Sequence, residues 1–226
     1  MENSAPNPEL LRSLGKLVRG LSALFWGLPA APIVCSETAI SDVLKPAGVA
    51  PALAVLALLL FGLWQIGGFQ KQERPWRDAL DRARLPAIVN LGLCPFFYWQ
   101  NQMPGEWFFT AALGVFALSF LLFIFNLNLV LAQLAAMLPD ETLRRDAAEF
   151  TALNRWLLAL WIVLAAFCVL ALQLGWPAQM APGRLFLAER TVEAMLIFLG
   201  LTPLAVTMSL IWKTKEVILN GVFGGK

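Results

Sequence analysis

Histidine is absent from this chain of 226 residues. The absence excludes His-ligated haem, His-ligated zinc and every catalytic triad that uses a histidine base. Cysteine is scarce, with three residues far apart and no CxxC spacing, so a disulfide framework is excluded as well. The glycine-rich motifs that cradle phosphates, GxxxxGK(S/T) and GxGxxG, are also missing. We therefore expect no cofactor, no metal and no enzymatic activity.

Charge is the second scarce property, because Asp, Glu, Lys and Arg make up 14% of the chain, against about 25% in a soluble domain. These residues are absent from six stretches: 20–36, 46–70, 86–105, 107–139, 156–183 and 194–212. A helix that crosses a bilayer needs about 20 mostly apolar residues, and five of the stretches meet or nearly meet this length. Backbone groups in lipid must bond within their own segment, so these stretches are predicted to be helices.

The sequence therefore predicts an all-α, polytopic integral membrane protein in which residues 1–226 form a single membrane domain. A cytoplasmic amphipathic segment is expected at 1–19, followed by six transmembrane helices at about 20–36, 49–67, 85–100, 107–134, 156–176 and 191–212. The first helix is short and contains two prolines. We interpret it as spanning rather than as a cleaved signal peptide, because no clear A-x-A cleavage site follows it.

The distribution of Lys and Arg predicts the orientation. If all six helices cross, 14 of the 17 basic residues lie on one side, and the other side holds Lys45, Arg184 and Arg190. The positive-inside rule then places both termini in the cytoplasm, in what we expect to be a plasma membrane of the bacterial inner-membrane type. The basic inner face is expected to attract anionic lipid. Other membrane proteins or a second copy are the further expected partners, and nucleic acid is not one.

A charged pattern occurs twice on the predicted inner side. "ERPWRDALD" at 73–81 aligns with "ETLRRDAAE" at 141–149 after a shift of 68 residues, and "PELLRSLGKLVRG" at 8–20 resembles them more faintly. In the first two, Glu precedes Arg by four residues, which places both on one helix face. Apolar residues follow at helical spacing on another face. We expect two or three amphipathic helices that lie on the inner membrane surface.

Two internal repeats compete to explain this pattern. In the first, a hairpin of two membrane helices is repeated three times with a period of about 65–70 residues. In the second, "LGLCP" at 91–95 matches "LGLTP" at 199–203, which implies an inverted duplication of three helices. Inverted duplication is the plan of many secondary transporters. The matches between charged residues favour the triplication, but the inverted repeat and the absence of any repeat both stay open.

Two prolines mark the first candidate site. Pro95 and Pro203 lie inside the third and sixth predicted helices, with Gly92 and Gly200 three residues before them. Proline removes a backbone donor and kinks a helix. Broken helices in corresponding positions point to the binding site of a transporter. The alternative, which we favour, is a plain kink that packs against a neighbouring helix.

Polar residues inside the apolar stretches are the second group of candidates. Asn126 and Gln133 are seven residues apart and share a helix face, and the other amides in or near these stretches are Asn90, Asn128 and Gln173. Such amides line a polar path or, as we favour here, bond between helices. Glu193 is the most deeply placed acid, about one turn inside the sixth helix. Its carboxylate is a candidate for cation or proton entry, or simply forms an ion pair at the interface.

These observations favour a non-catalytic integral membrane protein that acts as a subunit or scaffold of a membrane assembly. The alternative is a small-solute or ion transporter or channel with a site near the kinked third and sixth helices. An enzyme is disfavoured, since the predicted membrane cores contain no charged residue and no catalytic motif.

Overall fold

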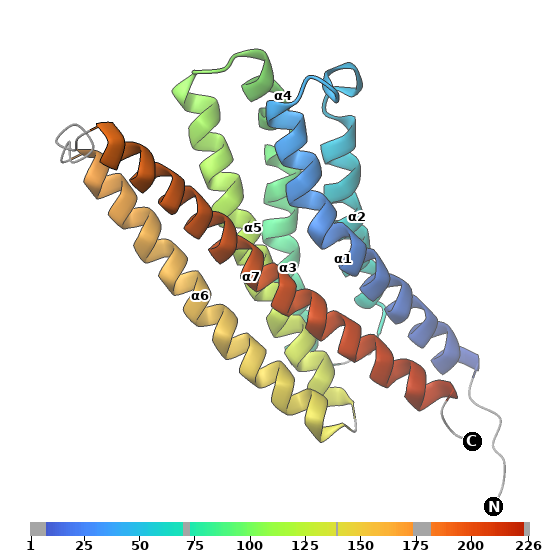
Figure 1. Cartoon of the computed structure of the whole chain (residues 1–226). Coiled ribbons are helices and arrows are strands. Elements are labelled where there is room, and N and C mark those ends of the chain that lie inside the picture. Colours follow the sequence, from blue (N-terminus) through green and yellow to red (C-terminus); the bar gives the residue numbers. More distant parts are fainter. Residues whose placement is uncertain (1–7, 70–72, 139, 174–181, 224–226) are drawn as a thin grey trace, which may run out of the picture.

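The computed structural model describes residues 8–69, 73–138, 140–173 and 182–223, and all regular structure within these ranges is helical. The elements are α1 (Pro8–Ile40), the 3₁₀ turn η1 (Lys45–Ala47), α2 (Ala50–Ile66), α3 (Arg74–Leu93), α4 (Pro95–Gln102), α5 (Trp107–Met137), α6 (Glu141–Gln173) and α7 (Pro182–Phe223) (Figure 1). The predicted all-α class is thus confirmed.

The helices form three consecutive hairpins. The first pairs α1 with α2, the second pairs α3 and α4 with α5, and the third pairs α6 with α7. In Figure 1, the first helix of each hairpin runs in one direction and the second helix returns, so that α1 begins and α7 ends at the same end of the bundle. The starts of α3 and α6, at residues 74 and 141, are 67 residues apart, which is close to the shift between the charged repeats.

The charged repeats do not form separate surface helices. Each is the first part of a longer helix that continues into the apolar stretch. The segment 8–20 lies in α1, 73–81 lies at the start of α3 and 141–149 begins α6. The apolar stripe of α3, which includes Trp76 and Leu80, is buried within the protein, as are Leu143 and Ala147 of α6. The prediction that these faces lie on the membrane surface is therefore wrong, because neighbouring helices cover them before lipid can.

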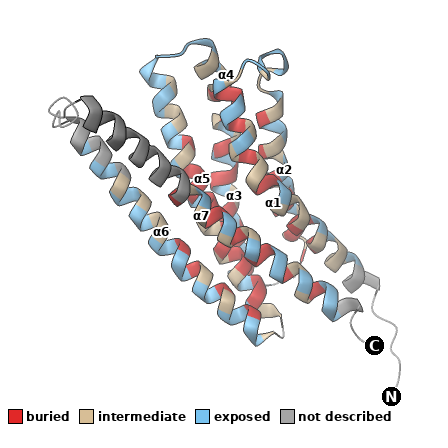
Figure 2. Cartoon of the chain, in the orientation of Figure 1, coloured by how far each residue is buried: buried red, intermediate tan, exposed pale blue. Residues whose placement is uncertain are grey.

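The core lies along α5. Large side chains of this helix, including Phe123, Leu127 and Leu131, are fully buried, and α5 packs against α3, α6 and α7. Figure 2 shows buried residues concentrated where the helices cross in the middle of the bundle, whereas α6 is mostly exposed or intermediate. The outward side of α5 also carries apolar residues, such as Val115 and Leu118. A helix that is apolar all round is typical of a membrane span.

Two glycines bring α1 and α2 close together where these helices cross. A Cβ atom built on Gly62 lies 3.0 Å from the carbonyl oxygen of Gly20 and 2.8 Å from Leu24 Cγ. A Cβ atom built on Gly20 lies 2.8 Å from the carbonyl oxygen of Gly62. Membrane helices use small residues in this way to bring their backbones together.

At the C-terminal end of α1, one side chain joins the first hairpin to the second. Asn101, near the end of α4, donates from Nδ2 to the carbonyl oxygens of Thr38 and Ser41, at 3.1 and 2.9 Å. These bonds supply donors to carbonyls at the C-terminus of α1, because the last carbonyls of a helix receive no N–H group from the helix itself.

Among the residues that the structure describes, three helices are long and apolar enough to cross a membrane: Arg12–Ile40 in α1, Trp107–Met137 in α5 and Glu141–Leu164 in α6. The apolar part of α2, Ala50–Ile66, is shorter. Length and composition are therefore compatible with an integral membrane protein. The six spans and the cytoplasmic location of both termini stay predictions.

Candidate functional site

The two candidate prolines have different structural roles. α3 ends at Leu93 and α4 begins at Pro95, so Pro95 does not lie inside a helix but opens a new one. In this position its missing N–H costs little, because the first N–H groups of a helix have no intrahelical partner. Gly92, just before the break, has open space where a side chain would lie.

Pro203 lies inside α7, which continues through it. It removes the backbone donor that the carbonyl of Leu199, four residues earlier, would otherwise receive. The other candidate nearby, Gly200, faces α6: a Cβ atom built on it lies 4.0 Å from Nε1 of Trp161. The α6–α7 contact therefore contains the one candidate proline that remains inside a helix.

A buried polar cluster joins three helices next to Pro203. Asn128 of α5 donates from Nδ2 to Oγ1 of Thr207 of α7 at 2.6 Å, and Asn154 of α6 donates from Nδ2 to the same oxygen at 3.3 Å. The exposed fraction is 0% for Asn128 and Thr207 and 2% for Asn154. We call these three residues the amide–hydroxyl cluster.

The hydroxyl of Thr207 uses its full bonding capacity. It accepts from the two amides and donates to the carbonyl oxygen of Pro203 at 2.7 Å, which matches the one donor and two lone pairs of a hydroxyl group. The two amide oxygens are different. Oδ1 of Asn128 and Oδ1 of Asn154 are buried and have no hydrogen-bond partner in the protein.

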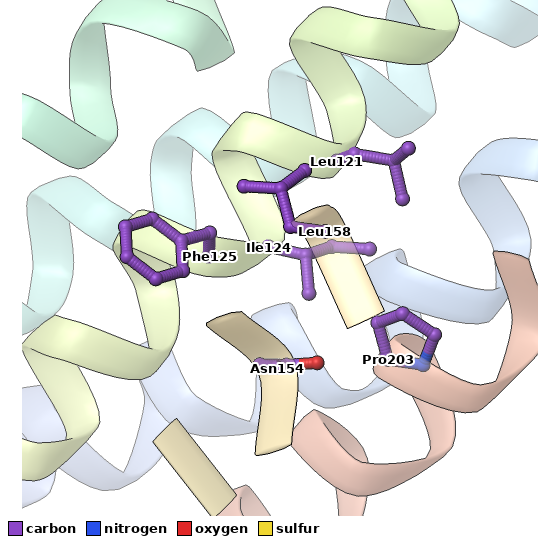
Figure 3. A pocket seen from close by; sticks show the side chains of 6 residues that line it. All are labelled: Leu121, Ile124, Phe125, Asn154, Leu158 and Pro203. Atoms are coloured by element: carbon purple, nitrogen blue, oxygen red, sulfur yellow. The ribbon is translucent and has the colours of Figure 1, made fainter. Parts of the chain in front are cut away.

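The cluster borders a small cavity of about 10 Å³. The residues that line it are Leu121, Ile124, Phe125, Asn154, Leu158 and Pro203. In Figure 3 the side chain of Asn154 points toward Pro203, with its oxygen at the tip, while the other labelled side chains are apolar. The cavity is thus an apolar space with one polar group from α6 and Pro203 of α7 at its edge.

Of the predicted polar residues, Asn128 belongs to this cluster, whereas Asn90, Asn126 and Gln133 do not. Asn126 donates to the carbonyl oxygen of Leu122 in its own helix at 2.7 Å, and Gln133 is exposed. Asn90 is buried in α3, and its Oδ1 has no partner in the protein. Glu193 belongs to α7, but its side chain lies outside the described residues.

Sequence analysis did not select Asn154 or Thr207. Asn154 precedes Arg155 at the edge of a charge-free stretch, where a polar residue is usually a solvated one. Thr207 follows Pro203 by four residues, and this spacing was the available signal, because a hydroxyl at that position reaches the carbonyl of the proline. Asn128, by contrast, is one of the polar residues that the sequence singles out, and it lies on a different face of α5 from Asn126.

Ion pairs lie at the predicted inner end of the α6–α7 hairpin. Lys213 Nζ is 2.7 Å from Asp146 Oδ2, and it also lies 5.5 Å from the centre of the Phe150 ring. Asp140 caps α6 by accepting from the hydroxyl of Thr142 and from the backbone N–H groups of Thr142 and Leu143. These bonds, the hydroxyl bond first, lower the pKa of the Asp140 carboxyl below its ordinary value of 3.8.

Comparison of the chain with protein-family models, with curated proteins and with solved structures finds no match. Among the residues that the structure describes, no group of three or more His, Cys, Asp or Glu side chains is placed to hold a metal ion. The amide–hydroxyl cluster itself consists of two amides and a hydroxyl, which are neutral hydrogen-bonding groups.

Proposed function

We propose that the chain is a non-catalytic integral membrane protein that acts as a subunit or scaffold of a membrane assembly. Its helices are held together by neutral contacts: the glycine crossing of α1 and α2, the apolar core along α5 and the amide–hydroxyl cluster. Such an interior suits a protein whose work is done at its outer surface.

The exposed face of α6 carries the proposal. In the most apolar part of α6, 17% of the residues are buried within the protein, against 39% in α1 and 33% in α5. α6 is therefore the least covered of the three candidate spans. Small and large residues alternate along this face every three or four positions. The exposed residues of this face are Ala152, Trp156, Ala159, Val163, Ala166 and Leu170. We call them the α6 face.

This arrangement is typical of helix–helix contacts. The three alanines are seven residues apart, and Trp156, Val163 and Leu170 follow each of them by four. A seven-residue spacing keeps one face of a helix against a partner helix. Small residues on such a face allow the two backbones to approach closely in a membrane. The α6 face therefore supports contact with another membrane helix.

Purification of the tagged protein from its native membrane in mild detergent tests this function. We expect a companion protein, or a second copy, at a fixed stoichiometry by size-exclusion chromatography and mass spectrometry. We expect the double substitution Ala159→Leu and Ala166→Leu to release it, because added side chains hold the helices apart. Leu160→Phe, which adds bulk at a neighbouring exposed position, serves as the control. A monomer without companions, or association that both variants keep equally, refutes the proposal.

A small-solute or ion transporter is the second candidate function. The supporting observations are the break at Pro95, the proline inside α7 and the cavity beside Asn154. A volume of about 10 Å³ is at the lower limit for a single water molecule, so transport of a larger solute requires a second conformation. Ion and solute flux into liposomes that contain the purified protein tests this candidate, and flux equal to that of empty liposomes removes it.

The lipid partner follows from the same architecture. Basic residues gather at the end of the bundle where α1 begins and α7 ends, including Arg12, Lys16 and Lys215. If this end is cytoplasmic, as proposed, its charge favours anionic headgroups of the inner leaflet.

A further inference from the structure

The cavity beside Pro203 is the place where an unsatisfied polar group and an empty volume coincide. Asn154 is 2% exposed, and its amide nitrogen is bonded to Thr207, but its Oδ1 has no donor within the protein. Buried polar groups nearly always have a partner, and ordered water is the usual one where the protein supplies none. A partner for this oxygen must come from the cavity that Asn154 lines.

α7 provides a second acceptor one helical turn before Pro203, which lines the cavity. Pro203 lines the cavity and has no N–H group, so the carbonyl of Leu199 does not receive its usual helical hydrogen bond from residue 203. In membrane helices, ordered water is one of the groups that satisfy a carbonyl released by proline. The missing partner on both helices is a hydrogen-bond donor, and a water molecule carries two.

The size of the cavity limits its occupant. A volume of about 10 Å³ corresponds to roughly one water-sized probe, and the smallest water sites have about 10–15 Å³. No Asp or Glu is among the lining residues, so a bare cation at this depth would lack the opposite charge that compensates for its lost hydration.

We propose that this cavity binds a single water molecule, which donates one hydrogen bond to Oδ1 of Asn154 and the other to the backbone that Pro203 leaves without a donor. The water replaces the missing N–H group and joins α6 to α7 at Pro203. It extends the amide–hydroxyl cluster from Thr207 toward Pro203, so that α6 is bonded to α7 on both sides of the proline. The site is independent of whether the chain acts as a scaffold or as a transporter.

Water-edited solid-state NMR of the protein in liposomes, with asparagine labelled, tests this site. At short mixing times we expect magnetisation from water to reach the side-chain amide of Asn154 although that side chain is buried. The signal is expected to disappear in Leu158→Phe, because the larger side chain fills the cavity. Leu160→Phe makes the same change on the same helix at an outward-facing position, and it is expected to retain the signal.

Three results overturn the proposal. The first is no water signal at Asn154 in the unchanged protein, a measurement that does not depend on any variant folding. The second is a signal that Leu158→Phe retains, provided that the Asn128 amide resonance shows the cluster intact. The third is a signal that changes when choline replaces sodium in the buffer, because this dependence identifies a cation rather than water as the occupant.

Discussion

At the scale of single residues, the hydroxyl of Thr207 has more interhelical partners than any other hydroxyl whose bonds are described. It bonds to amides on α5 and α6 and to a carbonyl of its own helix. The alternative for either amide is an unsatisfied polar group in an apolar interior, which is unfavourable. A neutral cluster of this kind fixes the relative positions of three helices without a buried charge.

We expect Thr207→Val to destabilise the protein by about 1 kcal/mol, the usual size of a lost buried hydrogen bond in water or between membrane helices. Valine keeps the shape of threonine but cannot accept from Asn128 and Asn154. Unfolding of the detergent-solubilised protein by SDS measures the difference in free energy.

Thr214→Val is the matched control for this experiment. Thr214 is equally buried in α7, but its Oγ1 donates to the carbonyl of Leu210 in the same helix, at 2.8 Å. We expect a smaller loss of stability than for Thr207→Val. Equal losses in the two variants contradict a role of Thr207 in joining the helices.

At the scale of elements, local chemistry determines where some helices begin, and packing determines whether a helix continues through a proline. Asp140 supplies a cap at the start of α6, and Pro95 lies in the first turn of α4, where proline is favoured. By contrast, Pro203 does not end α7, because packing against α5 and α6 outweighs the lost hydrogen bond there. Identical residues therefore produce a break in one helix and a continuous helix in another.

Because Gly62 lies at the crossing of α1 and α2 and Gly114 does not, we expect the same Gly→Ala substitution to have different effects on stability at these two positions. We expect Gly62→Ala to destabilise the protein by about 1–3 kcal/mol, since the new methyl group meets the backbone of Gly20 and the core is overpacked. Gly114→Ala on α5, where a Cβ atom meets nothing within 4 Å, is expected to be neutral or to stabilise the helix by about 0.5–1 kcal/mol. Thermal unfolding of both variants in the same detergent provides the comparison.

A stable Gly62→Ala protein whose α1–α2 distance is unchanged contradicts the close crossing. The distance is measured between spin labels placed on exposed positions of the two helices.

At the scale of the whole molecule, three hairpins place the charged segments together. The starts of α1 and α6 and the end of α7 share one end of the bundle, and the η1 turn lies at the other (Figure 1). The asymmetry of charge between the two ends is the feature on which the predicted orientation depends. Helices α5 and α6 connect the ends across the full thickness of the bundle.

Labelling with a membrane-impermeant maleimide tests this orientation in a chain whose three native cysteines are replaced. We expect Val43→Cys, in the turn after α1, to react in intact cells. Arg144→Cys, near the start of α6, is expected to react only after the membrane is permeabilised. Both positions are exposed in the folded chain, so a lack of reaction reports the membrane rather than burial. Reaction of both in intact cells refutes an odd number of crossings between them.

The sequence by itself determined the helical class and the approximate apolar segments. Long runs without charge leave the backbone no partner in lipid other than itself, so local composition is sufficient to predict helices. It also located the paired charged segments, whose spacing agrees with the starts of α3 and α6. These properties depend on residues near one another in the chain.

Only the tertiary structure decided which polar residues meet. Asn128 and Thr207 are 79 residues apart, and Asn154 and Thr207 are 53 apart, so no local period relates them. The same holds for the stripes of α3 and α6, where periodicity predicts an apolar face but not whether lipid or another helix covers it. The different roles of Pro95 and Pro203 likewise depend on neighbouring helices. Contacts between distant segments depend on the packing of the whole bundle, so a local sequence pattern does not predict them.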